Sequence, residues 1–361
     1  MSKKLLMKGN EAIAEAAIRA GVQGYYGYPI TPQSELLEYM SSELPKRGGA
    51  FVQAESEVAA INMVYGASGA GARTMTSTSG PGFSLMQEAI SYIACAELPC
   101  FLVNVMRGGP GLGTIQPSQG DYFQAVKGGG HGDYKMIVLA PNSVQEMADF
   151  TYLGFDLADK YRTPTMILTD GALGQMMESV QFPEYNLDEH LVDKPWATTG
   201  RENGRKQNVI TSLHLQSEQM EQINLKLQKK YREIEKNEVR YETIETEDAD
   251  FLIVAFGLSS RVCHKALELA REEGLKVGLL RPITLYPYPY DILNKLADQV
   301  KGMLVVEMNA GQMLEDVKLA VNGKVSVDFY GRMGGMIPQP DAILSKIREL
   351  YSAHTKTKME V

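Results

Sequence analysis

The sequence has few of the residues from which metal and cluster sites are built. Its 361 residues include three cysteines, Cys95, Cys100 and Cys263, and no two of them have C-x-x-C spacing. The five histidines are scattered along the chain, so the sequence offers no ligand set for zinc or an iron–sulfur cluster. We interpret the cysteines as small buried residues of a protein from a reducing compartment.

The chain also lacks an excess of positive charge and a long apolar run. Its formal net charge is -8, which argues against nucleic-acid binding because phosphate contacts need a dense lysine and arginine surface. The apolar stretch near the N-terminus is only "LLM", which is too short for a signal peptide or a membrane span. The sequence therefore predicts a cytoplasmic protein that binds neither nucleic acid nor membrane.

What is present is an alternation of apolar, strand-like runs with helical patterns. In the first half, "VQGYYGYP", "TMTSTSGPG", "CFLVNVMRGG" and "PTMILTD" alternate with helical segments. This order predicts a parallel sheet covered on both faces. Asn10 is expected to cap the first helix, and Ser143 with Glu146 forms a predicted capping box.

The length of the chain predicts two domains. We predict an α/β fold of two three-layer domains, each built on a parallel sheet. Residues 1–190 form the first domain, residues 191–246 a connector, and residues 247–361 the second domain, which begins with "ADFLIVAFGLSSR". The connector contains "SEQMEQINLKLQKKYREIEKNEVRYETIE", a charged pattern that predicts a helix with a solvated face.

A stiff corner follows the first strand-like run at residues 27–35, "GYPITPQSE". Pro29 and Pro32 fix their own backbone angles and restrict the residues before them, so they hold Thr31 in one position. The Thr31 hydroxyl can then either meet a substrate or cap the helix that "QSELLEYM" begins. The corner alone does not decide between these two roles.

Two further groups stand where an open α/β sheet binds its ligands. Glu55 and Glu57 precede a helix of small and apolar residues, and read alone either is a first-turn acid favoured by the helix dipole. Arg107 follows a buried run at the carboxyl end of a strand. Its fork suits a carboxylate, which can belong to a substrate or to the protein itself.

The sequence contains neither of the two common glycine-rich nucleotide-binding motifs in complete form. "GGPGLG" follows a strand, but the "TIQPSQGDY" after it does not open the helix that a dinucleotide fingerprint requires. The sequence also lacks a G-x-x-x-x-G-K-[ST] motif. We therefore expect neither a Rossmann NAD site nor a phosphate loop.

Three segments, taken in order, resemble the alpha subunit of the 2-oxoacid:ferredoxin oxidoreductases: "GYPITPQSE", "AESEVAAINMVYGASGAGARTMTSTSGPGFSLMQE" and "VNVMRGGPGLGTIQPSQGDY". "KGNEAIAEAAIRAG" and "AELPCFLVNVMRGGPGLG" are most similar to the branched-chain members, which act on 3-methyl-2-oxobutanoate (2-ketoisovalerate). The resemblance runs from Met7 to about Met177. It resumes at "LRPITLYPYP", which resembles the transketolase C-terminal domain.

The resemblance implies a thiamine diphosphate enzyme to which this chain contributes the pyrimidine-binding domain, residues 1–190. The implied reaction is the oxidative decarboxylation of a branched-chain 2-oxoacid. Electrons then pass through iron–sulfur clusters to ferredoxin, and coenzyme A takes the acyl group. The resemblance gives residues 247–361 the transketolase C-terminal-like fold.

Specific residues also take roles from this resemblance. Glu57, rather than Glu55, presents the carboxylate to the aminopyrimidine ring, where it helps to form the nucleophilic carbanion. Thr31 and Arg107 hold the substrate carboxylate. Further cofactor contacts are implied for Pro29, Ile30 and Gly80.

The chain departs from the thiamine-enzyme pattern at the diphosphate. That pattern binds magnesium through a G-D-G acid and a later Asn-Asn, whereas "LTDGALGQ" has Asp170 and Gly171 without the first glycine or the asparagines. We therefore expect magnesium on a beta subunit that shares the cofactor, and iron–sulfur clusters on gamma and ferredoxin-like delta subunits. The chain alone is not expected to be active.

Two alternatives come from other functional classes. One is the equivalent subunit of an NAD-linked 2-oxoacid dehydrogenase or a transketolase-type enzyme, against which "YPITP" and the Arg107 segment argue. The other is a non-catalytic scaffold of the same fold. The presence of Thr31, Glu57 and Arg107 together argues against a scaffold.

Overall fold

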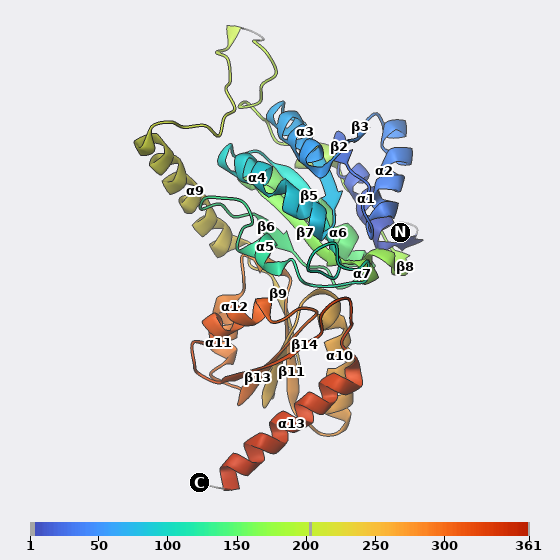
Figure 1. The fold of residues 1–361 in the computed structure, drawn as a ribbon, viewed down its shortest axis with the longest axis vertical. Coiled ribbons are helices and arrows are strands. Elements are labelled where there is room, and N and C mark those ends of the chain that lie inside the picture. Colours follow the sequence, from blue (N-terminus) through green and yellow to red (C-terminus); the bar gives the residue numbers. More distant parts are fainter. Residues whose placement is uncertain (1–3, 202–203, 360–361) are drawn as a thin grey trace.

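Two β-sheets, one in each half of the molecule, organise the fold (Figure 1). The computed structural model describes residues 4–201 and 204–359. The first sheet has the strand order β12-β6-β7-β5-β4-β2-β3, and all of its pairings are parallel except that of β12 with β6. Its strands are β2 (Gly24–Gly27), β3 (Ala50–Gln53), β4 (Thr74–Thr78), β5 (Cys100–Met106), β6 (Ile137–Leu139), β7 (Pro164–Asp170) and β12 (Thr284–Tyr286).

Helices cover both faces of this sheet, as expected for parallel strands that are apolar throughout. Every residue of β5 and β7 is buried. One face packs against α1 (Gly9–Arg19), α2 (Ser34–Glu43) and α6 (Val144–Tyr161), and the other against α3 (Glu57–Gly69) and α4 (Gly80–Cys95). Three short helices complete this half: η1 (Pro45–Arg47), α5 (Tyr122–Val126) and α7 (Gly171–Gln175).

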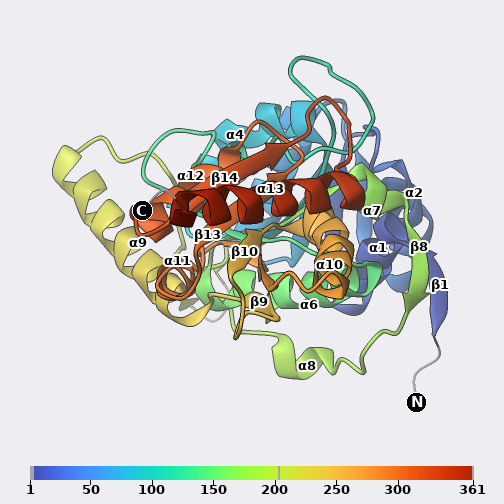
Figure 2. The same cartoon turned by 90° about the horizontal axis from the view of Figure 1, so that it is seen from below.

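The second sheet has the order β14-β13-β10-β11-β9, with β9 antiparallel to β11. Its strands are β9 (Tyr241–Ile244), β10 (Phe251–Val254), β11 (Val277–Pro282), β13 (Gly302–Glu307) and β14 (Ser326–Gly331). The long helix α13 (Pro340–Met359) lies across one face beside α10 (Gly257–Glu272), and α11 (Tyr290–Leu296) lies beside α12 (Gln312–Val321) (Figure 2). The predicted fold class, two α/β domains on parallel sheets, is confirmed.

The domain limits remain a prediction, but strand pairing crosses them in two places. β9 falls within the predicted connector and is an edge strand of the second sheet. β12 falls within the predicted second domain and is an edge strand of the first sheet. One core cluster also runs from the α3 and α4 face of the first sheet into the second domain. The two domains therefore share a packed interface.

Between the domains the chain runs over the surface of the first one. Strand β8 (Met177–Val180) pairs with β1 (Leu5–Lys8), and α8 (Leu187–His190) and α9 (Ser217–Asn237) follow. The charged helix predicted in this region is α9, of whose 21 residues only Leu227, Tyr231 and Ile234 are buried. Three buried residues on one face are enough to dock the helix while its other side stays in water.

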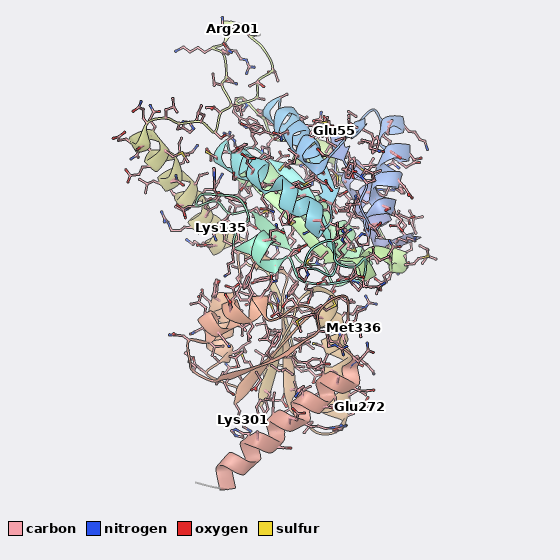
Figure 3. The ribbon with its side chains drawn as sticks, viewed as in Figure 1. Glu55, Lys135, Arg201, Glu272, Lys301 and Met336 are labelled. Atoms are coloured by element: carbon pink, nitrogen blue, oxygen red, sulfur yellow. The ribbon has the colours of Figure 1, made fainter. Side chains whose placement is uncertain are left out.

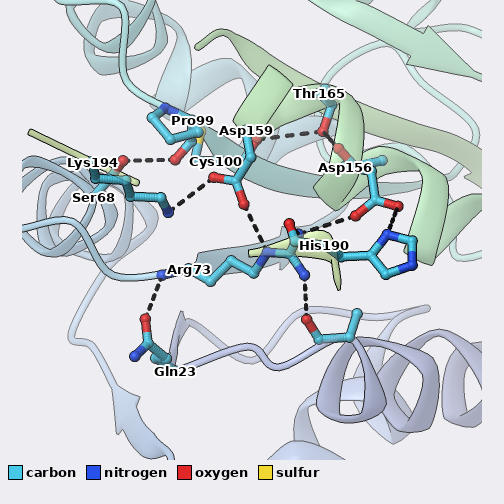
Figure 4. Close-up of polar contacts among 12 residues, drawn as sticks. Gln23, Ser68, Arg73, Pro99, Cys100, Asp156, Asp159, Thr165, His190 and Lys194 are labelled. Carbon is cyan, nitrogen blue, oxygen red and sulfur yellow. Dashed lines mark hydrogen bonds and ion pairs between the residues drawn. The ribbon is translucent and has the colours of Figure 1, made fainter. Parts of the chain in front are cut away.

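A buried arginine fastens the start of this surface segment to the first sheet (Figure 4). Arg73, just before β4, is 2% exposed and pairs with Asp159 at 2.8 Å and Asp156 at 3.0 Å, both on α6. Lys194 pairs with Asp159 at 2.9 Å, and the His190 ring bonds Asp156 at 2.8 Å. The acids of α6 thus bind both the sheet and the connector.

Of the two helix caps predicted from the sequence, one is confirmed and one is wrong. Ser143 caps α6 as predicted, accepting a hydrogen bond from the Glu146 amide at 3.2 Å, although the Glu146 carboxylate accepts from Asn142 rather than Ser143. The prediction for Asn10 was wrong, because α1 already begins at Gly9. Among the described residues, no helix is long and apolar enough to span a membrane.

Candidate active site

Four of the predicted site residues follow neighbouring strands of the first sheet. Thr31 comes after β2, Glu57 after β3, Gly80 after β4 and Arg107 after β5. From β2 the chain moves to the edge strand β3 and then crosses back to β4 on the other side of β2. This reversal is a topological switch point, and open α/β sheets bind ligands at the carboxyl ends of the strands there.

The proline corner, residues 27–35, is held by side chains as well as by its prolines. The buried Gln33 accepts a hydrogen bond from the Ser77 hydroxyl of β4 at 2.6 Å and donates to a backbone carbonyl within the corner at 3.3 Å. Asn10 donates to the Pro32 carbonyl at 2.9 Å. The side chain of Thr31 remains exposed. The corner is therefore fixed to its neighbours while its threonine faces outward.

Arg107 lies directly against this corner. Its Nη1 donates to the Thr31 carbonyl and its Nη2 to the Leu112 carbonyl, each at 3.0 Å. The Nε is buried and has no hydrogen-bond partner among the described residues. A guanidinium has five N–H donors, so three remain, and a carboxylate can still be bound by a pair of them.

Glu57 is a buried carboxylate at the start of α3. Ser56 caps the helix by accepting from the Ala59 amide at 3.2 Å, and Glu57 is its first residue. Glu57 is 5% exposed, whereas Glu55 is exposed at the surface (Figure 3). Across residues 4–201 and 204–359, no hydrogen bond or ion pair joins the Glu57 side chain to another residue. Its carboxylate oxygens keep some contact with solvent, so a partner from outside the chain can reach them.

Two glycines let side chains approach the first turn of α4. A Cβ on Gly82 would lie 2.4 Å from Oε1 of Glu57 and 2.2 Å from the Thr78 hydroxyl. A Cβ on Gly80 would lie 3.0 Å from Oδ2 of Asp121. Residues two apart on a helix point about 200° away from each other. Glu57 and Asp121 therefore lie on opposite sides of this turn.

The predicted residues thus form one neighbourhood in two parts. Thr31, Arg107 and Gly80 lie together, since Gly80 and Arg107 line one hollow of about 160 Å³. Glu57 lies on the far side of the first turn of α4. Pro29 is exposed and Ile30 is half-buried, both beside this region in the corner. Their roles toward a substrate or cofactor remain predictions.

Two polar residues of the site were missed by the sequence reasoning. Asp121 lines the Arg107 hollow and accepts from the buried Asn104 amide at 3.0 Å. Gln33 carries the contacts of the proline corner. Both stand in the quoted segments "QPSQGDY" and "YPITPQ". The only signal that could have found them is a polar residue in a loop that follows a buried strand.

Asp170, at the carboxyl end of β7, serves a structural role in the chain. Its Oδ1 accepts from the amides of Ala172 and Leu173 at 2.8 and 3.2 Å, which caps α7. Within the ranges that the structure describes, no three His, Cys, Asp or Glu side chains are grouped as ligands for a metal ion.

Both halves of the chain match known protein families. Residues 15–246 match the family described as "Pyruvate flavodoxin/ferredoxin oxidoreductase, thiamine diP-bdg", and residues 249–343 match "Pyruvate:ferredoxin oxidoreductase core domain II". The chain belongs to the 2-oxoacid:ferredoxin oxidoreductase family. It is a subunit of an oxidoreductase of this type, and its first matched region is a thiamine diphosphate-binding domain.

Curated relatives and solved structures agree with this membership. The ketoisovalerate oxidoreductase subunit VorB of Methanothermobacter thermautotrophicus is 54% identical over 96% of this chain and 97% of its own. The 2-oxoglutarate synthase subunit KorA of Methanocaldococcus jannaschii is 38% identical over 93% and 97%. The 2-oxoglutarate:ferredoxin oxidoreductase of Magnetococcus marinus superposes with a TM-score of 0.85 at 30% identity, covering 96% of this chain, which spans 65% of that one.

A split-gene transketolase shares the fold, with a TM-score of 0.59 at 14% identity, over 95% of this chain and 97% of its own. The site residues themselves fit a thiamine ring. Glu57 supplies an unpaired buried carboxylate, and Gly82 leaves the space beside it that a larger residue would fill. These two observations, made on this chain, agree with its membership of a thiamine diphosphate family.

Proposed function

We propose that this chain is the alpha subunit of an oxidoreductase that converts a branched-chain 2-oxoacid to its acyl-CoA and reduces ferredoxin. The observation that carries the proposal is Glu57, a carboxylate that is 5% exposed and has no partner in the described chain. When bound, thiamine diphosphate supplies the nucleophilic carbon for decarboxylation. Glu57 would hold a ring nitrogen of the bound cofactor with its carboxylate.

Thr31 and Arg107 hold the substrate in this proposal. The two N–H groups that Arg107 gives to backbone carbonyls fix its guanidinium, and three N–H donors remain for a ligand. A guanidinium held in advance binds a carboxylate without the cost of ordering a flexible side chain. The exposed Thr31, whose carbonyl is bonded to Arg107, adds a hydroxyl as a directional donor. Pro29 and Ile30 of the corner and Gly80 of α4 are assigned further contacts with the cofactor.

The branched-chain substrate is supported by two observations. The VorB relative, named for ketoisovalerate, is 54% identical, and the KorA relative, named for 2-oxoglutarate, is 38% identical. The loop beside Arg107 also presents Leu112 and Ile115, which are 82% and 58% exposed. Apolar side chains next to the carboxylate-binding arginine suit an aliphatic substrate better than one with a second charge.

The surface beside the site supports the proposal that the chain binds partner subunits. Helices α3 and α4 each contain a single charged residue, Glu57 and Glu88. Their exposed residues include Val58, Met63 and Leu85. A helix that is apolar on all sides is normally covered on all sides. We assign this face to a beta subunit that brings magnesium and the diphosphate site, while gamma and delta subunits bring the iron–sulfur clusters and the path to ferredoxin.

The test is an assay of the assembled complex on a panel of 2-oxoacids, with coenzyme A and either ferredoxin or NAD as acceptor. We expect the highest kcat/KM on 3-methyl-2-oxobutanoate, with electrons passed to ferredoxin. Faster turnover of 2-oxoglutarate would overturn the substrate assignment. Reduction of NAD without ferredoxin would favour the NAD-linked alternative, and absence of turnover on every 2-oxoacid would favour a scaffold.

A further inference from the structure

Asp121 stands in the hollow that contains Arg107. The hollow, of about 160 Å³, is lined by both of these residues, by Gly80 and Ser84 of α4, and by the loop 108–112. The substrate carboxylate is assigned to Arg107 in the function proposed above. An acid in the same small space must therefore come close to any 2-oxoacid bound there.

The position of Asp121 is set from two sides. Asn104, which is fully buried in β5, donates its amide to Oδ2 of Asp121 at 3.0 Å. Helix α4 approaches from the other side, where a Cβ on Gly80 would lie 3.0 Å from the same oxygen. Asp121 is thus held by a buried donor and by the backbone of a helix.

The second domain fixes the loop that ends at Asp121. Gln119 is 1% exposed, and its Nε2 donates to the Phe256 carbonyl at 2.8 Å. Its Oε1 accepts from the Ser259 hydroxyl at 2.7 Å and the Met308 amide at 2.9 Å. Its own amide donates to the Met308 carbonyl at 3.0 Å. These contacts hold the chain two residues before Asp121 in one place, so the acid is placed before a substrate arrives.

The surroundings of Asp121 favour protonation of its carboxyl group more than water does for a free aspartate. Burial raises the pKa of the Asp121 carboxyl, and the Asn104 hydrogen bond and the positive charge of Arg107 act in the opposite direction. A substrate carboxylate on Arg107 neutralises that positive charge and adds a negative charge beside Asp121. Both changes raise the pKa of Asp121 further.

The other charged groups on the elements packed around Asp121 have partners or lie elsewhere. Lys127, at the end of α5, is paired with Asp316 of α12. Glu57 of α3 lies on the opposite side of the first turn of α4. Arg107 is therefore the charge that acts on Asp121 from within the hollow.

We propose that Asp121 is a further substrate-binding residue, which carries a proton when the 2-oxoacid is bound and donates its O–H to an oxygen of that substrate beside Arg107. The proposal rests on the proposed function. It predicts that substrate binding takes up a proton wherever the free enzyme holds Asp121 ionised. It also gives the second domain a role in substrate binding, because Gln119 holds the loop.

The first test compares Asp121→Asn and Asp121→Ala in the assembled, cofactor-loaded complex, by measuring kcat/KM against pH. The wild type should lose about tenfold per pH unit above the pKa of Asp121. The asparagine amide keeps a donor and does not ionise, so this variant should lose that alkaline decline and stay within about tenfold of the wild type at low pH. The alanine variant should be low at every pH. Asp188→Asn, an exposed acid on α8, is the matched control and should behave as the wild type.

Several results would overturn the assignment of Asp121. An alkaline decline that persists in Asp121→Asn assigns it to another group. A loss above a hundredfold at every pH in Asp121→Asn means that the ionised form is the one used. Activity of the wild type on a 2-oxoacid tests the proposed function separately, because it does not depend on how the variants behave.

A second measurement does not depend on whether the variants assemble. The wild-type complex is titrated calorimetrically at high pH with 2-hydroxy-3-methylbutanoate, which carries the carboxylate but no reactive keto group. Repeating the titration in buffers of different ionisation enthalpy gives the number of protons taken up on binding. We expect uptake of close to one proton per site, and binding without proton uptake would refute the proposal.

Discussion

Replacing Glu57 by glutamine should leave the chain folded and make the enzyme inactive. The carboxylate is 5% exposed and has no partner in the described chain. Its oxygens keep contact with solvent, so the carboxylate does not carry the cost of about 1–3 kcal/mol of a fully buried unsatisfied group. Glutamine has the same size and no charge, so Glu57→Gln should change the free energy of unfolding of the purified chain by less than about 1 kcal/mol. Urea denaturation monitored by circular dichroism measures this change.

In the assembled complex the same substitution should abolish catalysis. A positioned acid or base contributes on the order of a hundred- to ten-thousand-fold in rate, and kcat should fall on that scale while the complex and its clusters remain. The control is Glu55→Gln, because Glu55 is exposed two residues away, and it should change stability and kcat little. Normal turnover by Glu57→Gln, or a loss of more than about 2 kcal/mol of stability, would refute the reasoning. Either result would make Glu57 an ordinary first-turn acid of α3.

Three other perturbations test separate parts of the molecule. Arg107→Lys keeps the charge and loses the fork that also binds the Thr31 carbonyl, so KM for the 2-oxoacid should rise in steady-state assays while thiamine diphosphate stays bound; an unchanged KM would exclude Arg107 from the substrate site. Arg73→Met removes the 2.8 Å partner of the buried Asp159 and leaves it paired with Lys194, so chemical denaturation should show a loss of about 1.5–3 kcal/mol; a loss below about 1 kcal/mol, the usual worth of a surface pair, would contradict the burial. Burial raises the pKa of Asp170 to about 7, so the folded state binds a proton that the unfolded state has released, and stability should fall as pH rises from about 4 to 7 by on the order of 4 kcal/mol. Asp170→Asn keeps the cap on α7 and should remove this dependence, and an identical pH dependence of the denaturation midpoint in both proteins would assign it to another group.

The sequence carried the information for the fold class and the family because both depend on local signals. Runs such as residues 100–106 and 164–170 are apolar throughout, as in strands buried on both faces, and helical segments separate them. Short loops after such strands place their residues at one edge of the sheet. This rule placed Arg107 at the ligand-binding edge, and the family resemblance joined Thr31 and Glu57 to it. The structure places all three at that edge.

Local signals were weaker where two interactions competed for the same residue. Asn10 has the side chain of a helix cap, and the sequence predicted that role. The structure places it inside α1, where its amide donates to the Pro32 carbonyl at 2.9 Å and to Glu35 at 3.0 Å. A hydrogen-bond partner 22 residues away can outweigh a local preference, and no pattern along the chain predicts such a partner.

The tertiary structure alone decided which acids are buried and which residues meet across the domains. Glu55 and Glu57 are equivalent in the sequence, but the packing of α3 against α4 buries one and leaves the other in water. Asp121 and Arg107 line one hollow, and the loop before Asp121 is held by Gln119, which is bonded to residues more than 130 positions away. Composition and periodicity determine which elements form, since these depend on neighbours along the chain. Burial and long-range hydrogen bonds depend on how those elements pack, and that is a property of the folded chain as a whole.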